Sequence, residues 1–263
     1  MKISIITVNY NDAPGLEKTL ASETALRLPA GVETEIIVID GGSTDGSVET
    51  LNRFSEKIAH SVSEPDRGIF HAMNKGVAAA TGDFCIFMNS GDRFASEDVL
   101  EKIFAEAGAR ERFESDVVTG STIYVDSVAG TREFGRAPAA VSLGFFYNKT
   151  LQHQSSFIRT ERLRRFPYDE TLKIVGDIRF WLECLILGGG DYARTSVPVA
   201  EFDLAGVRAR PEGAEDAELR RVFHDLKLEN IIRDYDLIMR PADLKMRVCR
   251  HFFSRALKKE LDL

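Results

Sequence analysis

Short apolar runs that recur along the first 90 residues restrict this chain more than any other feature. Residues 3–9 and 35–39 are rich in β-branched side chains, and residues 84–88 form a third run of the same kind. Runs without polar alternation are typical of strands buried on both faces, as in a parallel sheet. Helical patterns separate them, so strand and helix alternate at intervals of roughly 30–40 residues. This order predicts an α/β fold with a right-handed, Rossmann-like, mostly parallel sheet flanked by helices.

The segments between the strands carry helix signals. Asn11 or Asp12 can cap a first helix, and a second helix is expected after residue 47. A weaker strand at 58–63 then leads to a helix over 69–80. Each strand is therefore followed by a helix that can return the chain to the same sheet edge.

The second half of the chain is less regular. Residues 116–134 predict strands or a hairpin, residues 151–158 another strand, and residues 176–187 an amphipathic helix. From about residue 212 to the end the pattern is helical, with Pro241 separating two helices. These features fit one large α/β domain, or one such domain with a C-terminal appendage.

Composition excludes several classes of protein. The chain is 44% hydrophobic, has three cysteines and carries a net charge of −7. No apolar run approaches ~18 residues, so we expect no membrane span, and the N-terminus reads as a strand rather than a signal peptide. The cysteines are far apart, which argues against a disulfide framework or zinc cluster. An acidic body argues against nucleic-acid binding, and we expect the protein to be cytoplasmic.

Polar residues follow three of the predicted strands. Asn9, Asp40 and the segment 89–92 each come directly after an apolar run. In a doubly wound sheet the carboxyl ends of parallel strands share one rim, where ligands bind. Asp40 can accept hydrogen bonds from a nucleobase imide or from ribose hydroxyls, or can simply serve the turn that follows it. The chain lacks both the GxGxxG and the GxxxxGK[ST] pattern, so dehydrogenase and P-loop hypotheses lose their main support.

Four segments, taken in order, resemble glycosyltransferase family 2, and in particular bacterial enzymes of the exopolysaccharide, O-antigen and colanic-acid type. The segments are TVNYN (7–11), VIDGGSTDGS (38–47), EPDRGIFHAMNKG (64–76) and FMNSGD (87–92). The resemblance covers about residues 1–190. It implies a GT-A fold over 1–205, with a nucleotide-binding half to about 115 and an acceptor half over 116–205, and a helical C-terminal extension over 206–263. It also implies a nucleotide-diphosphate sugar donor and inversion at the anomeric carbon.

The resemblance also implies roles for individual residues. The nucleotide-binding residues would be Thr7, Val8, Asn9, Tyr10, Asp40, Asp66, Asn74 and Lys75. The family's metal motif, Asp-x-Asp-Asp, falls on residues 89–92, where this chain keeps only its last acidic residue. Asp92 would bind Mg²⁺ or Mn²⁺, and Asn89 could add a carbonyl oxygen.

The catalytic base is expected further along the chain. The segment IVGDIRFWL (174–182) resembles the family's acidic dipeptide at the start of a helix, and here the carboxylate is Asp177. The alternative is a carboxylate that only favours the helix N-terminus. His153 and Gln154 match a pair near the family's active site, so they either contact the diphosphate, metal or acceptor, or are packed residues. Cys85, Cys184 and Trp181 are interpreted as core residues.

The C-terminal segment differs in charge from the rest of the chain. Seven basic residues lie in 240–263, and residues 241–259 mix them with apolar ones. This segment is either a helix lying on an anionic membrane surface, at the inner face of the cytoplasmic membrane, or a structural cap.

The acceptor would be a saccharide or a polyprenyl-linked sugar. The alternative function is a catalytically impaired relative that binds a nucleotide sugar or a partner enzyme; a nucleotidyltransferase lacks support because the basic, glycine-rich loop is missing after the first strand.

Overall fold

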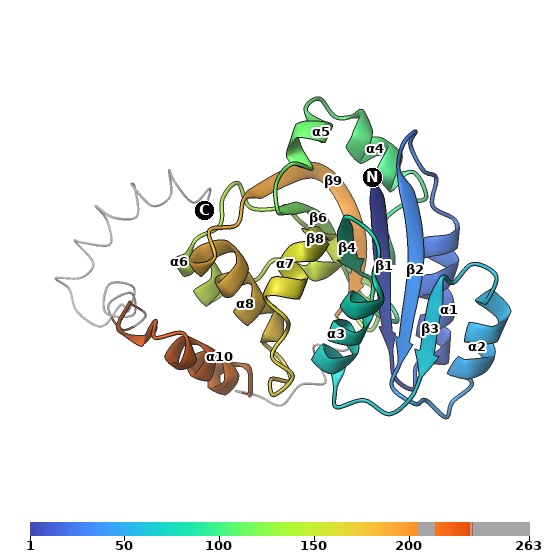
Figure 1. Cartoon of the computed structure of the whole chain (residues 1–263), viewed down its shortest axis with the longest axis horizontal. Coiled ribbons are helices and arrows are strands. Elements are labelled where there is room, and N and C mark those ends of the chain that lie inside the picture. Colours follow the sequence, from blue (N-terminus) through green and yellow to red (C-terminus); the bar gives the residue numbers. More distant parts are fainter. Residues whose placement is uncertain (205–213, 232, 234–263) are drawn as a thin grey trace.

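In the computed structural model, which describes residues 1–204, 214–231 and 233, nine strands form one sheet (Figure 1). Four parallel strands make up its first half, in the order β3-β2-β1-β4. Their bounds are β1 Lys2–Asn9, β2 Glu33–Asp40, β3 His60–Ser63 and β4 Phe84–Phe87. The register sets Asn9 opposite Asp40. The predicted rim of polar strand ends is therefore confirmed at β1 and β2.

The second half of the sheet is mixed rather than parallel. Beyond β4 the order continues β8-β6-β9-β5, and β7 forms a hairpin with β6. These strands are β5 Arg93–Phe94, β6 Val117–Asp126, β7 Thr131–Gly135, β8 Ser156–Arg159 and β9 Tyr192–Asp203. The hairpin was expected over 116–134, whereas β9 was not predicted. The strand predicted at 151–158 begins only at Ser156, because a 3₁₀ turn occupies His153–Ser155.

Helices cover both faces of the sheet. Figure 1 shows α1 and α2 on one side of the parallel strands and α3 on the other, on the same side as α7 and α8. The described helices are α1 Ala13–Thr24, α2 Ser47–Phe54, α3 Ile69–Ala79, α4 Val99–Ala105, α5 Ala109–Arg112, α6 Leu143–Asn148, α7 Thr160–Arg165, α8 Gly176–Trp181 and α10 Ala214–Asp225. A π-helical turn, Leu182–Leu187, continues α8. Asp12 caps α1, since its Oδ1 accepts the Gly15 amide at 3.1 Å.

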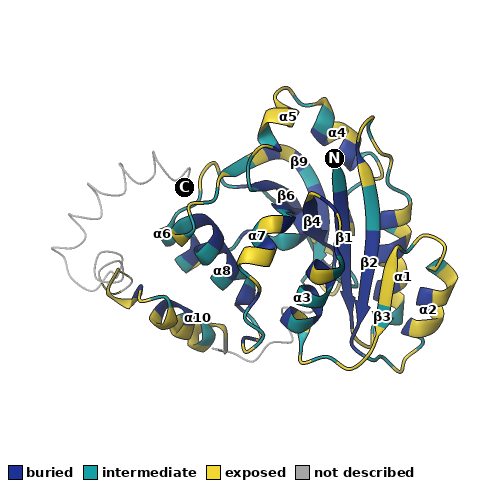
Figure 2. Ribbon diagram, viewed as in Figure 1, coloured by how far each residue is buried: buried dark blue, intermediate teal, exposed yellow. Residues whose placement is uncertain are grey.

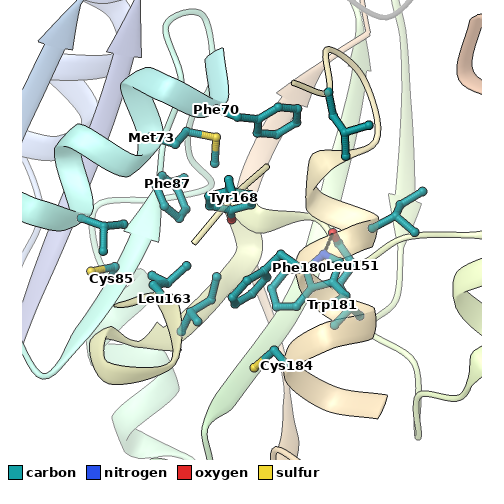
Figure 3. Packing of buried hydrophobic residues seen from close by; sticks show 14 of the residues in the cluster. Phe70, Met73, Cys85, Phe87, Leu151, Leu163, Tyr168, Phe180, Trp181 and Cys184 are labelled. Carbon is teal, nitrogen blue, oxygen red and sulfur yellow. Dashed lines mark hydrogen bonds between the residues drawn. The ribbon is translucent and has the colours of Figure 1, made fainter. Parts of the chain in front are cut away.

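The largest hydrophobic cluster lies between the sheet and α3, α7 and α8 (Figures 2 and 3). Trp181 is fully buried there, and its indole N–H donates to the Leu151 carbonyl at 3.1 Å. Cys85 and Cys184 are buried free thiols in the same cluster. The prediction that these three residues belong to the core is confirmed.

The C-terminal helix α10 belongs to this core as well. Val222 and Phe223 are buried in the large cluster. On the same helix, the Glu218 carboxylate accepts three consecutive backbone amides, of residues 173–175, at 2.8, 2.8 and 3.1 Å. These amides directly precede α8. The predicted helical character from about residue 212 is confirmed for α10, while the segment after Pro241 lies outside the described residues.

Among the helices that the structure describes, none combines the length and apolar character needed to cross a membrane.

Candidate active site

A cavity of about 600 Å³, here called the first pocket, lies at the carboxyl ends of β1, β2 and β4. Its walls are Val8, Asn9, Tyr10, Asp12, Gly41, Pro65, Asp66, Gly68, Ile69, Ala72, Asn89 and Ser90. Gly41 is needed for its shape. A Cβ at this position would lie 2.7 Å from a carboxylate oxygen of Asp66 and 3.1 Å from the ring of Tyr10. A larger residue would therefore push both side chains out of place.

Hydrogen bonds from buried residues hold the strand ends that form the pocket wall. Asn9 donates to Asp40 at 2.6 Å and accepts from the Ser90 hydroxyl at 2.7 Å. Asp40 is fully buried and also accepts from the amide and hydroxyl of Ser43 and from the Ser63 hydroxyl. Burial opposes its ionisation, but these hydrogen bonds outweigh it, led by those from Ser43 and Ser63, and they lower the pKa of Asp40. Asp40 thus supports the wall from behind.

The predicted nucleotide-binding residues divide into two groups. Val8, Asn9, Tyr10 and Asp66 line the first pocket, and Tyr10 is 68% exposed. The others, like Asp40, are absent from its walls and bond to protein. Thr7 donates to Glu23 at 2.6 Å, Asn74 binds both backbone groups of Tyr168, and Lys75 forms an ion pair with Glu64 at 2.6 Å. This placement favours a supporting role for the second group over the direct contact that the resemblance implied.

Asp92 does not face the first pocket. It is 5% exposed, and its two oxygens accept from the Gln154 amide at 3.0 Å and from the backbone N–H of Asp203 at 3.3 Å. Burial raises the pKa of Asp92 to about 7. A carboxylate that is buried, absent from the pocket walls and bonded to protein through both oxygens is poorly placed for the metal-binding role expected for it. Its partner Gln154 is likewise buried.

Two other oxygen-bearing side chains, those of Asn89 and Asp12, line the first pocket. Asn89 lies 3.1 Å from His153 through its amide nitrogen, and its Oδ1 is buried with no hydrogen-bond partner among the described residues. Asp12 places Oδ2 at 3.7 Å from the point where a Cβ of residue 91 would lie. Gly91 is where the family motif has an acidic side chain, so a carboxylate from the α1 cap reaches that space. Carboxylate and carbonyl oxygens suit Mg²⁺ or Mn²⁺.

Nothing in the sequence pointed to Asp12 as more than a helix cap, because it lies far from Gly91 along the chain. Within the described part of the chain there is no group of three or more His, Cys, Asp or Glu residues that could hold a metal ion by itself. A divalent cation here would therefore need oxygens of the bound diphosphate to complete its coordination.

Asp177 lies in the first turn of α8. Its Oδ1 accepts the amide of Ile178 at 2.9 Å, and its Oδ2 accepts the Thr150 hydroxyl at 3.3 Å. The preceding Gly176 packs under α3, where a Cβ would lie 2.6 Å from the ring of Phe70. That ring occupies the space of the first acidic residue in the family dipeptide. The loss of one acidic residue here is therefore coupled to the packing of α3, and Asp177 remains half-buried.

A larger cavity of about 960 Å³, here called the second cleft, begins beside Asp177. Thr150, which donates to Asp177, is one of its lining residues. Phe70, the neighbour of Ile69 in the first pocket, contacts Gly176. Asp177 itself lines neither cavity: one hydrogen bond, from Thr150, links it to the second cleft, and Gly176 and Phe70 lie between it and Ile69 of the first pocket.

The chain was compared with known proteins. The family "Glycosyl transferase family 2" matches residues 4–173. An uncharacterized glycosyltransferase of Mycobacterium tuberculosis is 33% identical over 84% of this chain and 82% of its own. A PGL/p-HBAD biosynthesis glycosyltransferase of Mycobacterium bovis is 28% identical over 69% and 68% of the two chains.

Solved structures give the same fold. The structure of S. aureus TarS 1–349 with UDP has a TM-score of 0.65 at 22% identity, over 84% of this chain and 64% of that one, so the match spans less than two thirds of that TarS chain. The mannosyltransferase PcManGT of Pyrobaculum calidifontis, solved with GDP-Man and Mn²⁺, has a TM-score of 0.54 at 16% identity, over 97% and 80%. The chain therefore belongs to glycosyltransferase family 2 and has the GT-A-like α/β fold, a mixed sheet flanked by helices.

Proposed function

We propose that the protein is an inverting glycosyltransferase that moves a hexosyl or N-acetylhexosaminyl group from a nucleoside-diphosphate sugar to a saccharide or polyprenyl-linked acceptor. The observation that supports the proposal is the hydrogen bond from Thr150, a residue of the second cleft, to the half-buried carboxylate of Asp177 in a chain of this family. The pathway that we propose is bacterial cell-surface polysaccharide biosynthesis, and one relative is itself named for a biosynthetic pathway, PGL/p-HBAD biosynthesis. TarS was solved with UDP-GlcNAc and PcManGT with GDP-Man, so both nucleotides are candidates.

The residues divide the work as follows. Tyr10 and Asp66 contact the nucleoside in the first pocket, and Asn9 keeps the wall in place. Asp177 takes the proton of the acceptor hydroxyl while that oxygen bonds to the anomeric carbon on the face opposite the nucleotide. The bond from that carbon to the diphosphate oxygen breaks, and the nucleoside diphosphate leaves with the electron pair. A divalent cation held by Asp12 and Asn89 would supply positive charge to the diphosphate.

Asp177→Asn tests the catalytic assignment. The asparagine side chain can still accept a hydrogen bond through its carbonyl oxygen but cannot take a proton, so kcat should fall by about 10²–10⁴ while donor affinity stays within about twofold. Asp169→Asn is the matched control, because Asp169 is bonded to Arg179 of the same helix, whereas Asp177 is bonded to Thr150 of the second cleft. If Asp177→Asn retains more than about a tenth of the wild-type kcat, another residue is the base.

The metal assignment separates Asp12 from Asp92. Calorimetry of UDP and GDP binding, with and without Mn²⁺, should show that Asp12→Asn abolishes the gain from Mn²⁺ and that Asp92→Asn keeps it. The reason is that only Asp12 faces the first pocket. An asparagine at this position can still accept the Gly15 amide, so the cap of α1 is retained. The opposite pattern would restore the motif assignment of the metal to Asp92.

The second candidate, a catalytically impaired relative, is favoured by the glycines at positions 91 and 176, where the family patterns have acidic residues. The two candidates differ in turnover. Release of UDP from a UDP-sugar, or of GDP from a GDP-sugar, in the presence of acceptor would exclude the catalytically impaired relative. Nucleotide-sugar affinity with no release under any acceptor tested would favour it.

The proposal places the protein in the cytoplasm, at the inner face of the membrane. The basic and apolar residues of 241–259 support this placement through their composition. Flotation of the full chain and of residues 1–240 with anionic or neutral vesicles is the test. Salt-sensitive binding to anionic vesicles that is lost with the tail would support the membrane role, and unchanged binding would make the segment a structural cap.

A further inference from the structure

The second cleft has an uneven charge. Its lining residues are Thr119, Gly120, Thr122, Tyr124, Gly135, Arg136, Ala137, Pro138, Ala139, Ala140, Gly144, Phe145, Asn148, Lys149, Thr150, Leu151, Gln152 and Arg194. Three of these are cationic and none is acidic. In a protein whose net charge is −7, a cleft of about 960 Å³ with only positive charge is unexpected. A cleft lined by one sign of charge concentrates ligands of the other sign.

The three cations are exposed side chains without an ion-pair partner in the described part of the chain. They are Arg136, Lys149 and Arg194, and Arg194 donates a hydrogen bond to the Ala137 carbonyl at 3.3 Å. Other arginines of the same half are paired: Arg162 lies 2.7 Å from Asp116 and Arg179 lies 2.9 Å from Asp169. The cleft cations therefore keep their hydrogen-bonding capacity for a ligand.

The cations come from three separate segments of the cleft wall. Lys149 precedes Thr150, which donates to Asp177. Arg136 and Arg194 also line a third cavity of about 720 Å³, together with Glu106, which pairs with Arg112.

Apolar side chains complete the wall. Ala137, Pro138, Ala140, Phe145 and Leu151 line the same cleft. A ligand that satisfies both features has an anionic group beside an apolar portion. Arginine guanidinium groups bind phosphate and carboxylate oxygens in a bidentate, charge-assisted manner, whereas a neutral sugar offers them only uncharged oxygen acceptors.

We infer that the second cleft binds an anionic acceptor, recognised by Arg136, Arg194 and Lys149, and that these residues select it over a neutral one. The identification of the bound anion as the acceptor depends on the proposed function. The anion site itself depends only on the residues that line the second cleft. The anionic group has two sources, the phosphate of a lipid-linked sugar or the carboxylate of an acidic sugar.

Binding experiments separate these sources without using catalysis. The probes are decyl phosphate, decyl glucuronide and decyl glucoside, which share a tail and differ in the head group, each used below its micelle concentration. Saturating UDP fills the first pocket, so that a phosphate cannot be counted there. Calorimetry compares the wild type with the double variant Arg136→Gln/Arg194→Gln and with Lys149→Gln. Thermal melting confirms that each exposed substitution leaves the fold intact.

The control is Arg132→Gln, which removes one positive charge close by. Arg132 pairs with Glu201 outside the cleft, and Glu201 retains Arg93 as a partner. We expect the wild type to bind one anionic probe at least tenfold more tightly than decyl glucoside, and the double variant to lose that preference. Preference for decyl phosphate assigns the lipid phosphate, and preference for decyl glucuronide assigns the acidic sugar.

Equal binding of all three probes, or an equal loss in Arg132→Gln, would overturn the anion site. A failure of the proposed function would look different, since it would show as an absence of UDP and GDP binding while the probe preference persisted.

Discussion

Glu23→Gln tests a buried acid that has one hydrogen-bond partner and a raised pKa. Glu23 is 3% exposed on α1, where Thr7 of β1 donates to its Oε1 at 2.6 Å. Its Oε2 has no partner among the described residues. Burial raises the pKa of Glu23 from 4.5 to about 8, and the Thr7 hydrogen bond opposes this only in part. Glutamine keeps the acceptor for Thr7 and removes the ionisable group.

The sign of the effect follows from linkage. Between pH 4.5 and 8 the native state keeps a proton that the unfolded chain releases, so stability falls as pH rises through this window. At 1.36 kcal/mol per pKa unit, this one group lowers the wild-type free energy of unfolding by about 3.5 kcal/mol between pH 5 and pH 8. At pH 5 the variant should be the less stable protein by about 1–3 kcal/mol, because its amide hydrogens lack an acceptor. At pH 8 the order should reverse or the two should become equal.

Urea unfolding at pH 5, 6.5 and 8 measures this difference, followed by the fluorescence of Trp181, the single tryptophan, and by circular dichroism. All other titrating groups are common to both proteins and cancel in the comparison. Glu17→Gln on the exposed side of α1 is the control, where only a surface ion pair with Arg53 is lost. If the stability difference between Glu23→Gln and wild type changes by less than about 1 kcal/mol from pH 5 to pH 8, Glu23 is not buried as an acid of raised pKa.

Three further substitutions distinguish a residue that lines the first pocket from residues that stabilise the fold. Tyr10→Ala should weaken UDP binding by about tenfold or more, since an aromatic platform contributes ~1–3 kcal/mol per base, and should leave urea stability within about 0.5 kcal/mol. Asn74→Ala should do the reverse: it loses two bonds to the Tyr168 backbone, destabilises the fold by about 2 kcal/mol and leaves UDP affinity of the folded protein unchanged. Gly76→Ala should destabilise by about 1–3 kcal/mol in thermal and urea unfolding, because its Cβ would lie 2.4 Å from Ile6. An unaltered midpoint for Gly76→Ala, or matching effects of the first two variants on UDP binding, would contradict these roles.

Local pattern was enough to predict the first half of the fold. β1, β2, β4 and α3 lie within one or two residues of their predicted spans, because each is an uninterrupted apolar run or a clear helical stripe. β9 escaped prediction for a physical reason. It contains Pro198 and charged residues, and its pairing with β6 shifts register near Ser121, so its pattern is not that of a regular strand.

The sequence predicted where in the fold the site lies, but it did not predict which side chains contact one another there. The strand-end rule located Asn9 and Asn89 on the pocket wall. This rule does not predict whether a carboxylate at a strand end points into the pocket or into the protein. Asp40 and Asp92 both point into the protein, where they accept hydrogen bonds from a hydroxyl and an amide group. Nor could the rule find Asp12 beside Gly91 or Thr150 beside Asp177, since those meetings depend on tertiary packing alone.

The three amides held by Glu218 bear on how such enzymes can be recombined. The residues 173–175 lie immediately before the helix of Asp177, and their partner carboxylate comes from α10, beyond the predicted boundary at residue 205. A chimera with a breakpoint between α8 and α10 would give this loop a foreign helix and leave up to three donors without an acceptor. Exchange of acceptor halves between relatives should therefore transfer α8 and α10 as one inherited block.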